Sequence, residues 1–514
     1  MQNFRFAILL LAALLSSLPL PAGRPRRNAK MQSVGMQYLQ SHFHLYDSLQ
    51  HRIFEYAETG YNEVRSAEAL CLHLEANGFR IERGVAGIPT AFVATFGSGN
   101  PVIGLMAEYD ALKGMSQDTV PFRKPLVEGG SGHGCGHNLL GTGSVAGAVA
   151  VSKWLAQGHP GTVKLFGCPA EEGGGGKAYM VREGCFDGLD AMLDWHPDTR
   201  NTVNTDTGLA NVQVKFTFHG TASHASGAPD KGRSALDAVE AFDFMINLMR
   251  EHIPSTSRIH YVITDGGKAP NIVPDKASVL YYFRSPKRAI VGDLLDRALK
   301  AAEGAALGTG TTFDHERISG NYERLPNTAL SHLLYANLRK VGGVQYDARE
   351  TAFAAEMMRN SGQPDTSVFA CVRTVVPPSE EGMSAWVSSD VGNVTWVVPT
   401  GSFRIAAFVP CSNGHSWQQT ASAGCTIGTK GLLNAARVLY LTAWDLLQNP
   451  ALLQKIQAEF RERRGPDFSF DPLMGDREPP FDYARRSKLD NHEENLPIPP
   501  APRRAWRMCP DQSS

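Results

Sequence analysis

The sequence lacks an excess of charge of either sign. Its 514 residues include 50 Lys and Arg against 51 Asp and Glu, which leaves a net charge of -1. A surface that binds nucleic acid needs a concentration of positive charge to neutralise phosphates. The balance of charge therefore gives no electrostatic argument for a nucleic acid partner.

Cysteine and long apolar runs are also scarce. The 8 cysteines are scattered over the whole chain, unlike the dense set of a small disulfide-stabilised protein. Only the stretch at 6–20 is a long apolar run, and no other stretch has the length and apolar character of a membrane span. We therefore expect the body of the protein to be soluble.

The N-terminus resembles a secretory signal peptide. Arg5 precedes the apolar run, and Pro21-Ala22-Gly23 follows it with small residues suited to cleavage. We expect a signal peptide at 1–23 and a secreted or periplasmic protein. An uncleaved anchor and a cytoplasmic location are the alternatives, because a basic stretch also follows the run.

The length predicts two domains, because one core rarely serves 514 residues. Short apolar runs alternate with segments of helical periodicity, which predicts an α/β domain with a largely parallel sheet. This larger domain is expected at 35–210 and 322–450. Its expected strands lie at 92–96, 102–107, 162–167, 191–195 and 403–409, and its principal helices at 138–156 and 427–447.

A different pattern begins at residue 212. The stretch 212–218 alternates apolar and polar residues, as a half-exposed antiparallel strand does. The order strand, helix, strand, strand, helix, strand predicts an inserted α+β unit of ferredoxin-like type at 211–321. The Pro- and Arg-rich tail at 465–514 has little apolar content, and we expect it to be disordered.

Residues of metal-ligand type follow the expected strands. Because ligands bind outside the carboxyl ends of strands in open α/β sheets, these residues are expected to meet at one edge. Cys135 and His137, two residues apart in a Gly-rich loop, would point to the same side of an extended segment. The candidates are Asp110, Cys135, His137, Glu171, Glu172, His196 and His415.

Thiolate, imidazole and carboxylate ligands together suit Zn²⁺, and a set of this size could hold two ions. Glu172 would bind metal, which leaves Glu171 free to take a proton from an activated water. The competing interpretation is a Gly-rich turn with a buried cysteine, surface histidines and a solvated pair of glutamates.

The chain resembles the M20 metallopeptidase and amidohydrolase family from about residue 56 to 447. The motifs that carry the resemblance are Glu108-Tyr109-Asp110-Ala111-Leu112, the loop 132–138, Pro169-Ala170-Glu171-Glu172-Gly173, Asp194-Trp195-His196-Pro197, 220–225 with 232–236, 271–274 with Arg284, and Gly414-His415-Ser416. The chain is most similar to the branch with Cys in place of a bridging Asp, which includes aminobenzoyl-glutamate hydrolase B subunits. Asn138 departs from this branch, which commonly has Asp there.

The resemblance implies a dinuclear metal hydrolase that acts on small N-acyl amino acids or dipeptides. It implies Zn or Mn ions held by Cys135, His137, Glu172, His196 and His415, and Glu171 as the general base. It also implies that 211–321 is a lid that joins two copies into a homodimer. His224 of this lid would stabilise the oxyanion in the partner copy, and Asn271 and Arg284 would bind substrate.

Two other functions stay open at this point. A dipeptidase or carboxypeptidase of broad specificity would use the same scaffold and ligands. A non-catalytic metal-binding subunit would work only with a second chain. The intact Glu171 and the complete ligand set favour an enzyme.

Overall fold

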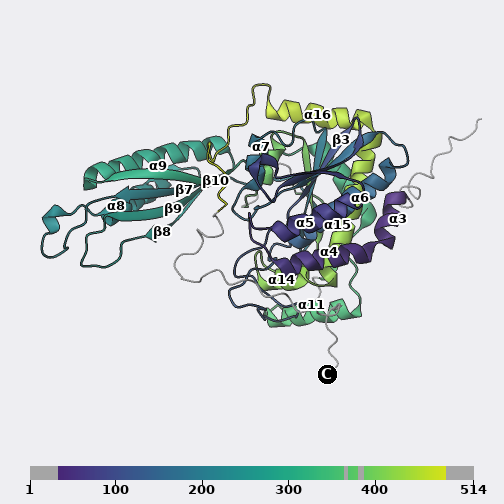
Figure 1. The fold of residues 1–514 in the computed structure, drawn as a ribbon, viewed down its shortest axis with the longest axis horizontal. Coiled ribbons are helices and arrows are strands. Elements are labelled where there is room, and N and C mark those ends of the chain that lie inside the picture. Colours follow the sequence, from purple (N-terminus) through teal and green to yellow (C-terminus); the bar gives the residue numbers. More distant parts are fainter. Residues whose placement is uncertain (1–32, 364–368, 380–386, 482–514) are drawn as a thin grey trace, which may run out of the picture.

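The structure is a computed structural model that describes residues 33–363, 369–379 and 387–481. It consists of a larger unit, in which helices cover a sheet, and a smaller unit that projects to one side (Figure 1). The predicted signal peptide at 1–23 lies outside the described residues.

The larger unit is built on a seven-stranded sheet in the order β1-β2-β4-β3-β5-β11-β6. The central strands β4, β3, β5 and β11 are parallel, and the outer pairings are antiparallel. This arrangement confirms the predicted α/β class. The strands are β1 (Arg80–Arg83), β2 (Phe92–Ser98), β3 (Val102–Ala107), β4 (Gly161–Gly167), β5 (Ala191–Asp198), β6 (Thr202–Asn204) and β11 (Thr400–Ala406).

Two long helices pack at the centre of this unit. α6 (His137–Leu155) is buried along almost its entire length and lies against α15 (Thr426–Gln448). Small residues permit this contact: a Cβ on Gly147 would lie 3.0 Å from Leu439. The other helices of the unit are α3 (Val34–Ser41), α4 (Phe43–Tyr56), α5 (Val64–Glu75), η1 (Val85–Gly87), α7 (Gly176–Arg182), α10 (Thr328–Val341), α11 (Ala348–Asn360), α12 (Ala370–Arg373), α13 (Val391–Thr395), α14 (Trp417–Ala423) and α16 (Pro450–Arg464). Among the described residues, no helix has both the length and the apolar character to span a bilayer.

The start of α6 differs from the expected one. The helix was expected to begin at Asn138, but it begins at His137, and its cap position is Gly136, which has φ 76°. Asn138 is instead fully buried and donates to Gln50 Oε1 at 2.7 Å and to the Ala423 carbonyl at 3.2 Å. The loop thus turns sharply between Cys135 and His137, rather than being extended as the spacing of these residues suggested.

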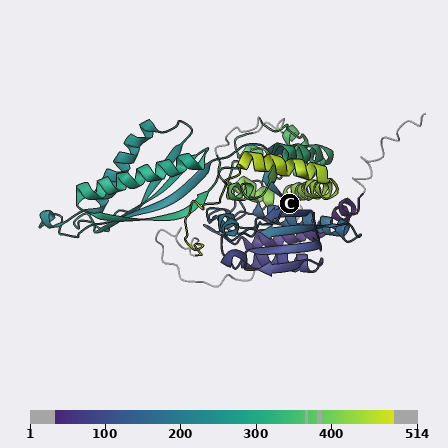
Figure 2. The same cartoon turned by 90° about the horizontal axis from the view of Figure 1, so that it is seen from above.

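The smaller unit contains a four-stranded antiparallel sheet in the order β10-β7-β9-β8. Its two long helices cover one face of the sheet (Figure 2) and form a separate apolar core with it. The elements are β7 (Ala210–His219), η2 (Pro229–Lys231), α8 (Ala235–Met249), η3 (Arg250–His252), β8 (Arg258–Asp265), β9 (Lys276–Ser285), α9 (Arg288–Thr309) and β10 (Thr312–Asn321). Their order follows the alternation and helical periodicity of the sequence.

The C-terminal strap, residues 465–481, corrects the expectation of a disordered tail from 465. Tyr322 Oη, just after β10, donates to the Asp471 carbonyl at 2.6 Å. Arg477 donates to the Arg317 carbonyl at 2.9 Å, and its own carbonyl accepts from Arg182 of α7 at 2.7 Å. The strap therefore ties the two units together. Its composition did not reveal this order, because the rings of Phe468 and Phe470 contact Tyr322, which is far from them in the sequence.

The contact between the strap and β10 generates a stability prediction. A Cβ on Gly320 would lie 2.5 Å from Leu473 Cβ, so we expect Gly320→Ala to destabilise the protein by about 1–3 kcal/mol through overpacking. Gly292→Ala is the control, because a Cβ there meets no described atom within 4 Å and alanine favours the helix. Thermal unfolding of both variants checks this, and equal midpoints would contradict it.

Candidate metal centre

The carboxyl edge of the central strands gathers the predicted ligands. Asp110 follows β3, Glu171 and Glu172 follow β4, His196 lies within β5, and His415 lies in the loop after β11. Cys135 and His137 come from the loop that opens α6. Because these strands are parallel, their ends deliver side chains from distant sequence positions to one place.

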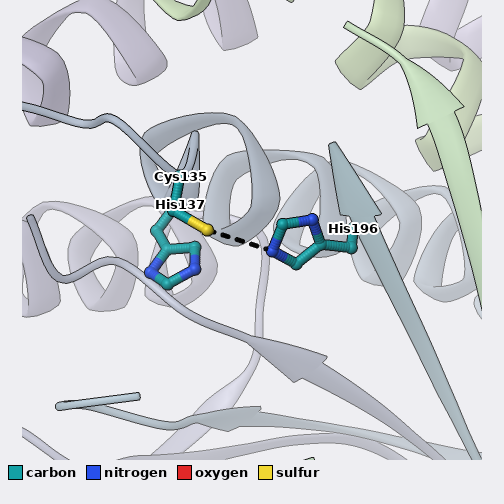
Figure 3. Close-up of side chains that lie close together, drawn as sticks. All are labelled: Cys135, His137 and His196. Carbon is teal, nitrogen blue, oxygen red and sulfur yellow. Dashed lines mark hydrogen bonds between the residues drawn. The ribbon is translucent and has the colours of Figure 1, made fainter. Parts of the chain in front are cut away.

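Two groups of potential ligands share one thiol. Cys135, His137 and His196 form the first group, and Cys135, Glu172 and His415 form the second. Figure 3 shows Cys135 pointing toward His196, with its Sγ 3.3 Å from Nε2 of that histidine. In the second group, His415 Nε2 lies 3.4 Å from Glu172 Oε1. The five predicted ligands thus converge, with Cys135 at the point where both groups meet.

The hydrogen bonds of His137 and His196 leave the Nε2 atom of each ring available to bind a metal ion. His137 Nδ1 donates to Asp110 Oδ1 at 2.7 Å, and His196 Nδ1 donates to the Pro197 carbonyl at 2.6 Å. In the neutral tautomer this leaves a lone pair on Nε2 of each ring. A backbone N–H at Glu172 donates to the second oxygen of Asp110 at 2.9 Å, so both oxygens of Asp110 are engaged in supporting the site.

These residues fit divalent metal ions. Two donor atoms that share a tetrahedral zinc ion, at bond lengths of about 2.0–2.3 Å, lie roughly 3.3–3.6 Å apart. The separations of 3.3 and 3.4 Å within the two groups match that spacing. His137 Nε2 and Glu172 Oε1 are buried without a hydrogen-bond partner among the described residues, which is costly unless a cation binds them.

The electrostatic environment also favours the binding of cations. Burial raises the pKa of the Cys135 thiol, and the nearby Glu172 carboxylate raises it further, so the thiolate forms only with a positive charge beside it. Burial, and then the charge of Arg404, lower the pKa of His196 to about 4. His196 is therefore a neutral ligand at pH 7.

Glu171 lies beside the ligands without belonging to either group around Cys135. It groups with Glu108 and His137, whose ligand atoms lie within 4.8 Å of its own. Burial raises its pKa well above the usual value, and Glu108 and Glu172 add to the effect. A carboxyl group with a raised pKa can accept and return a proton near neutral pH.

Glu171 and Glu172 follow a strained turn at Ala170, and the buried side chain of Glu63 stabilises this turn. Ala170 has φ 57°, and its N–H donates to Glu63 Oε1 at 2.8 Å. Glu63 also accepts from Thr90 Oγ1 at 3.1 Å and is fully buried. No sequence pattern indicated this role, because the glutamate lies more than 100 positions from the turn that it supports.

The glycines after Glu172 close the turn tightly. A Cβ on Gly176 would lie 2.0 Å from the Pro169 carbonyl oxygen, and one on Gly174 would lie 2.6 Å from Ala170 Cβ. These positions therefore require glycine for close packing. The turn also brings Lys177, at the start of α7, close to the candidate ligands.

Three buried charged residues that were not among the predicted site residues form a network here. Lys177 Nζ lies 2.6 Å from Glu108 Oε1 and 2.7 Å from Asp390 Oδ1, and none of the three side chains is exposed by more than 2%. Glu108 stands two residues before Asp110 at the end of a strand, so the alternation of the strand could have indicated it. No local sequence pattern marks Lys177 or Asp390.

The predicted residues of the smaller unit do not join this cluster. His224 and Asn271 lie in neighbouring loops beyond the end of β7, where the N–H of Ala225 donates to the Asn271 carbonyl at 3.0 Å. Arg284 pairs with Asn211 near the start of β7, beside the larger unit, and its Nη1 donates to Ser388 Oγ at 3.3 Å. The strand β7 separates the two positions by about 30 Å, given the usual rise per residue.

Comparison with protein families gives a match over residues 104–476 to the model described as Peptidase family M20/M25/M40. The chain belongs to this family. M20 membership makes it a hydrolase and confirms the resemblance drawn from its motifs.

Two curated M20 relatives match most of the chain. The B subunit of the p-aminobenzoyl-glutamate hydrolase of Escherichia coli (strain K12) is 40% identical over 443 residues, which cover 81% of this chain and 92% of the relative. The Xaa-Arg dipeptidase of Mus musculus is 31% identical over 387 residues, which cover 73% of this chain and 78% of the relative. A solved structure of a dinuclear metal binding M20 peptidase from Bacillus subtilis has a TM-score of 0.52 at 15% identity and covers 78% of this chain and 99% of its own, which supports the fold.

Glu63 generates a prediction about pH. Burial, and then the charge of Asp110, raise its pKa from 4.5 to about 8, so the folded protein keeps this proton while the unfolded chain has lost it. Between pH 4.5 and about 8 the unfolded state binds fewer protons than the folded state, so the free energy of unfolding falls as the pH rises. Glu63→Gln, which stays neutral, should therefore gain stability relative to the parent by up to a few kcal/mol from pH 4.5 to 8.

Thermal unfolding midpoints of Glu63→Gln and of the parent, measured across this range, check the prediction. Glu82→Gln, on the exposed strand β1, is the control and should follow the parent at every pH. A constant difference between Glu63→Gln and the parent would show that Glu63 is ionised in the folded state.

Proposed function

We propose that the chain is a metal-dependent amide hydrolase of small N-acyl amino acids or dipeptides, of the aminobenzoyl-glutamate type. The observation that carries this proposal is the thiol of Cys135, which belongs to two groups of ligand atoms at once. Such an arrangement suits two neighbouring divalent ions, Zn²⁺ or Mn²⁺, and the E. coli relative supplies the substrate class by its name.

The chemistry follows from the groups around the centre. When bound, the ions supply Lewis acidity, which polarises the scissile carbonyl and makes a water acidic enough to lose a proton near pH 7. Glu171 takes that proton as the water oxygen attacks the carbonyl carbon. The carbon–nitrogen bond then breaks, and Glu171 returns the proton to the leaving amine.

His224 is suited to stabilise the oxyanion by its tautomer. Its Nδ1 accepts hydrogen bonds from the N–H of Gly227 at 3.0 Å and of Ser226 at 3.3 Å, so in the neutral ring the proton lies on Nε2. The side chain is exposed at the far end of the smaller unit. We propose that it donates to the oxyanion in a second copy of the chain, with Asn271 beside it.

The surface of the smaller unit supports a homodimer through 211–321. The edge strand β8 exposes Tyr261, Val262 and Ile263. On α8, Leu248 is exposed and the side chain of Phe244 is 64% exposed. An edge strand beside exposed apolar side chains is a surface for association with another chain. A second copy is the occupant that would also bring His224 to a metal centre.

Arg284 is suited to bind the carboxylate of the substrate. Its Nε is buried and lacks a hydrogen-bond partner within the described ranges, and its side chain lies at the end of the smaller unit next to the larger one. A guanidinium group can pair with a carboxylate through two hydrogen bonds.

The mouse relative supports a second candidate, a dipeptidase, because its name is that of an Xaa-Arg dipeptidase. An amidohydrolase prefers a blocked N-terminus and a dipeptidase a free one. The E. coli relative is named as one subunit of an enzyme, so a requirement for a second chain is a further possibility. Assays of matched acyl and aminoacyl substrates separate the first two.

We also propose export from the cytoplasm, on the evidence of the N-terminal apolar run alone, with a cytoplasmic location as the alternative.

The role of Glu171 predicts a selective loss of turnover. Glu171→Gln should lower kcat by about 10²- to 10⁴-fold, because the amide cannot take the proton, while the bound metal is retained. Hydrolysis of aminobenzoyl-glutamate and metal content, measured on the same preparation, check this. Glu183→Gln, at an exposed position after α7, is the control. Turnover that survives in Glu171→Gln would overturn the proposed base.

The role of His224 in the partner copy predicts complementation. His224→Ala and Glu171→Gln should each be inactive alone, because each damages both sites of its own dimer. After mixing in equal amounts and exchange of subunits, about a quarter of the sites should combine an intact Glu171 with an intact His224. Recovery of activity toward that level checks the prediction, and a mixture as inactive as its components would show that His224 does not act in the partner.

A further inference from the structure

Glu108 is a fixed carboxylate at the end of β3. It follows Ala107, the last residue of that strand, and is 2% exposed. Its Oε1 accepts from Lys177 Nζ at 2.6 Å. Lys177 is itself bound by Asp390 at both its ammonium group and its backbone N–H, at 2.7 and 2.9 Å. One oxygen of Glu108 is therefore fully engaged, and the orientation of the carboxylate is set.

The other oxygen of Glu108 has no hydrogen-bond partner in the part of the chain that the structure describes. This Oε2 is buried and lies 3.2 Å from Nε2 of His137, which likewise lacks a hydrogen-bond partner there. Because His137 donates its Nδ1 proton to Asp110, Nε2 of the neutral ring carries a lone pair. Two buried lone pairs that face each other at this distance repel unless a proton or a metal ion lies beside both, and a metal ion that binds His137 displaces the proton.

The separation of these two atoms resembles that of the predicted ligand pairs. The 3.2 Å between Glu108 and His137 compares with 3.3 Å between Cys135 and His196 and 3.4 Å between His415 and Glu172. Glu108 and Asp110 differ sharply in their hydrogen bonds. Both oxygens of Asp110 accept hydrogen bonds, from His137 and from the N–H of Glu172, whereas Oε2 of Glu108 accepts none from the described residues.

We propose that Glu108 is a sixth ligand of the centre and binds, through Oε2, the same divalent ion as His137. Lys177 and Asp390 are positioning residues that hold its other oxygen away from the ion. This inference rests on the proposed metal-dependent function, since it concerns the ions of that centre. The competing explanation is a simple ion pair between Glu108 and a protonated His137, which would have no role once metal binds.

The test measures metal binding on the full-length chain. The protein is stripped with a chelator and titrated with Zn²⁺ against a competing indicator, and bound ions are counted by elemental analysis. The parent should bind two ions, and Glu108→Gln should bind one of them at least about tenfold more weakly, since even outer partners of ligands contribute 10- to 100-fold. Asp194→Asn is the matched control: it removes a buried carboxylate of the adjacent strand β5 that is hydrogen-bonded to Ser402 at 2.6 Å.

Cobalt gives a second readout that separates a ligand from a nearby charge. The absorption bands of the Co²⁺-loaded protein depend on the atoms that bind the ion. They should change in Glu108→Gln and stay unchanged in Asp194→Asn. If Glu108→Gln does not fold, Glu108→Asp retains the charge near Lys177 but withdraws the oxygen by one methylene, and the same loss of affinity is expected.

The outcomes distinguish this inference from the proposed function. Two ions bound with parental affinity and unchanged cobalt spectra in Glu108→Gln would overturn the sixth ligand and leave the hydrolase proposal intact. Failure of the parent chain to bind any ion would overturn the proposed function itself.

Discussion

Buried negative charge at the carboxyl edge of the sheet is the constraint on which the rest of the structure depends. Four carboxylates and a thiol lie close together there: Glu108, Asp110, Glu171, Glu172 and Cys135. Buried charges of one sign are tolerated only when cations or hydrogen bonds compensate them. The chain supplies Lys177 as a fixed cation, and the proposed metal ions supply the remainder.

The fold serves this centre by bringing distant residues to one edge. Parallel strands all end on the same side, so ligands separated by nearly 300 positions, such as Cys135 and His415, meet without long loops. The packing of small residues along α6 fixes the loop that carries Cys135 and His137. A strained turn at Ala170, held by Glu63, fixes the two glutamates. Rigid elements on every side allow the ligands to be oriented before any ion binds.

The smaller unit carries the three residues that we propose to contact the substrate. It presents His224 and Asn271 at one end and Arg284 at the other, so one copy cannot bring all three residues to a single centre without a large movement. Exposed apolar residues on β8 and α8 form the surface that we propose for a second copy. The C-terminal strap meanwhile holds the smaller unit to the larger one through Tyr322 and Arg477.

The sequence by itself determined the fold class, the principal strands and helices, and the edge of the sheet at which the five candidate ligands meet. Apolar periodicity reports burial within one strand or helix, and residues that end strands of a parallel sheet must share an edge. The tertiary structure alone decided which charged residues surround those ligands. Lys177, Asp390 and Glu63 look like surface residues in sequence, and only the packing of separate elements buries them beside the centre. The strap was missed for the same reason, because Phe468 and Phe470 pack against Tyr322 and Trp396 of distant segments and are only partly buried there.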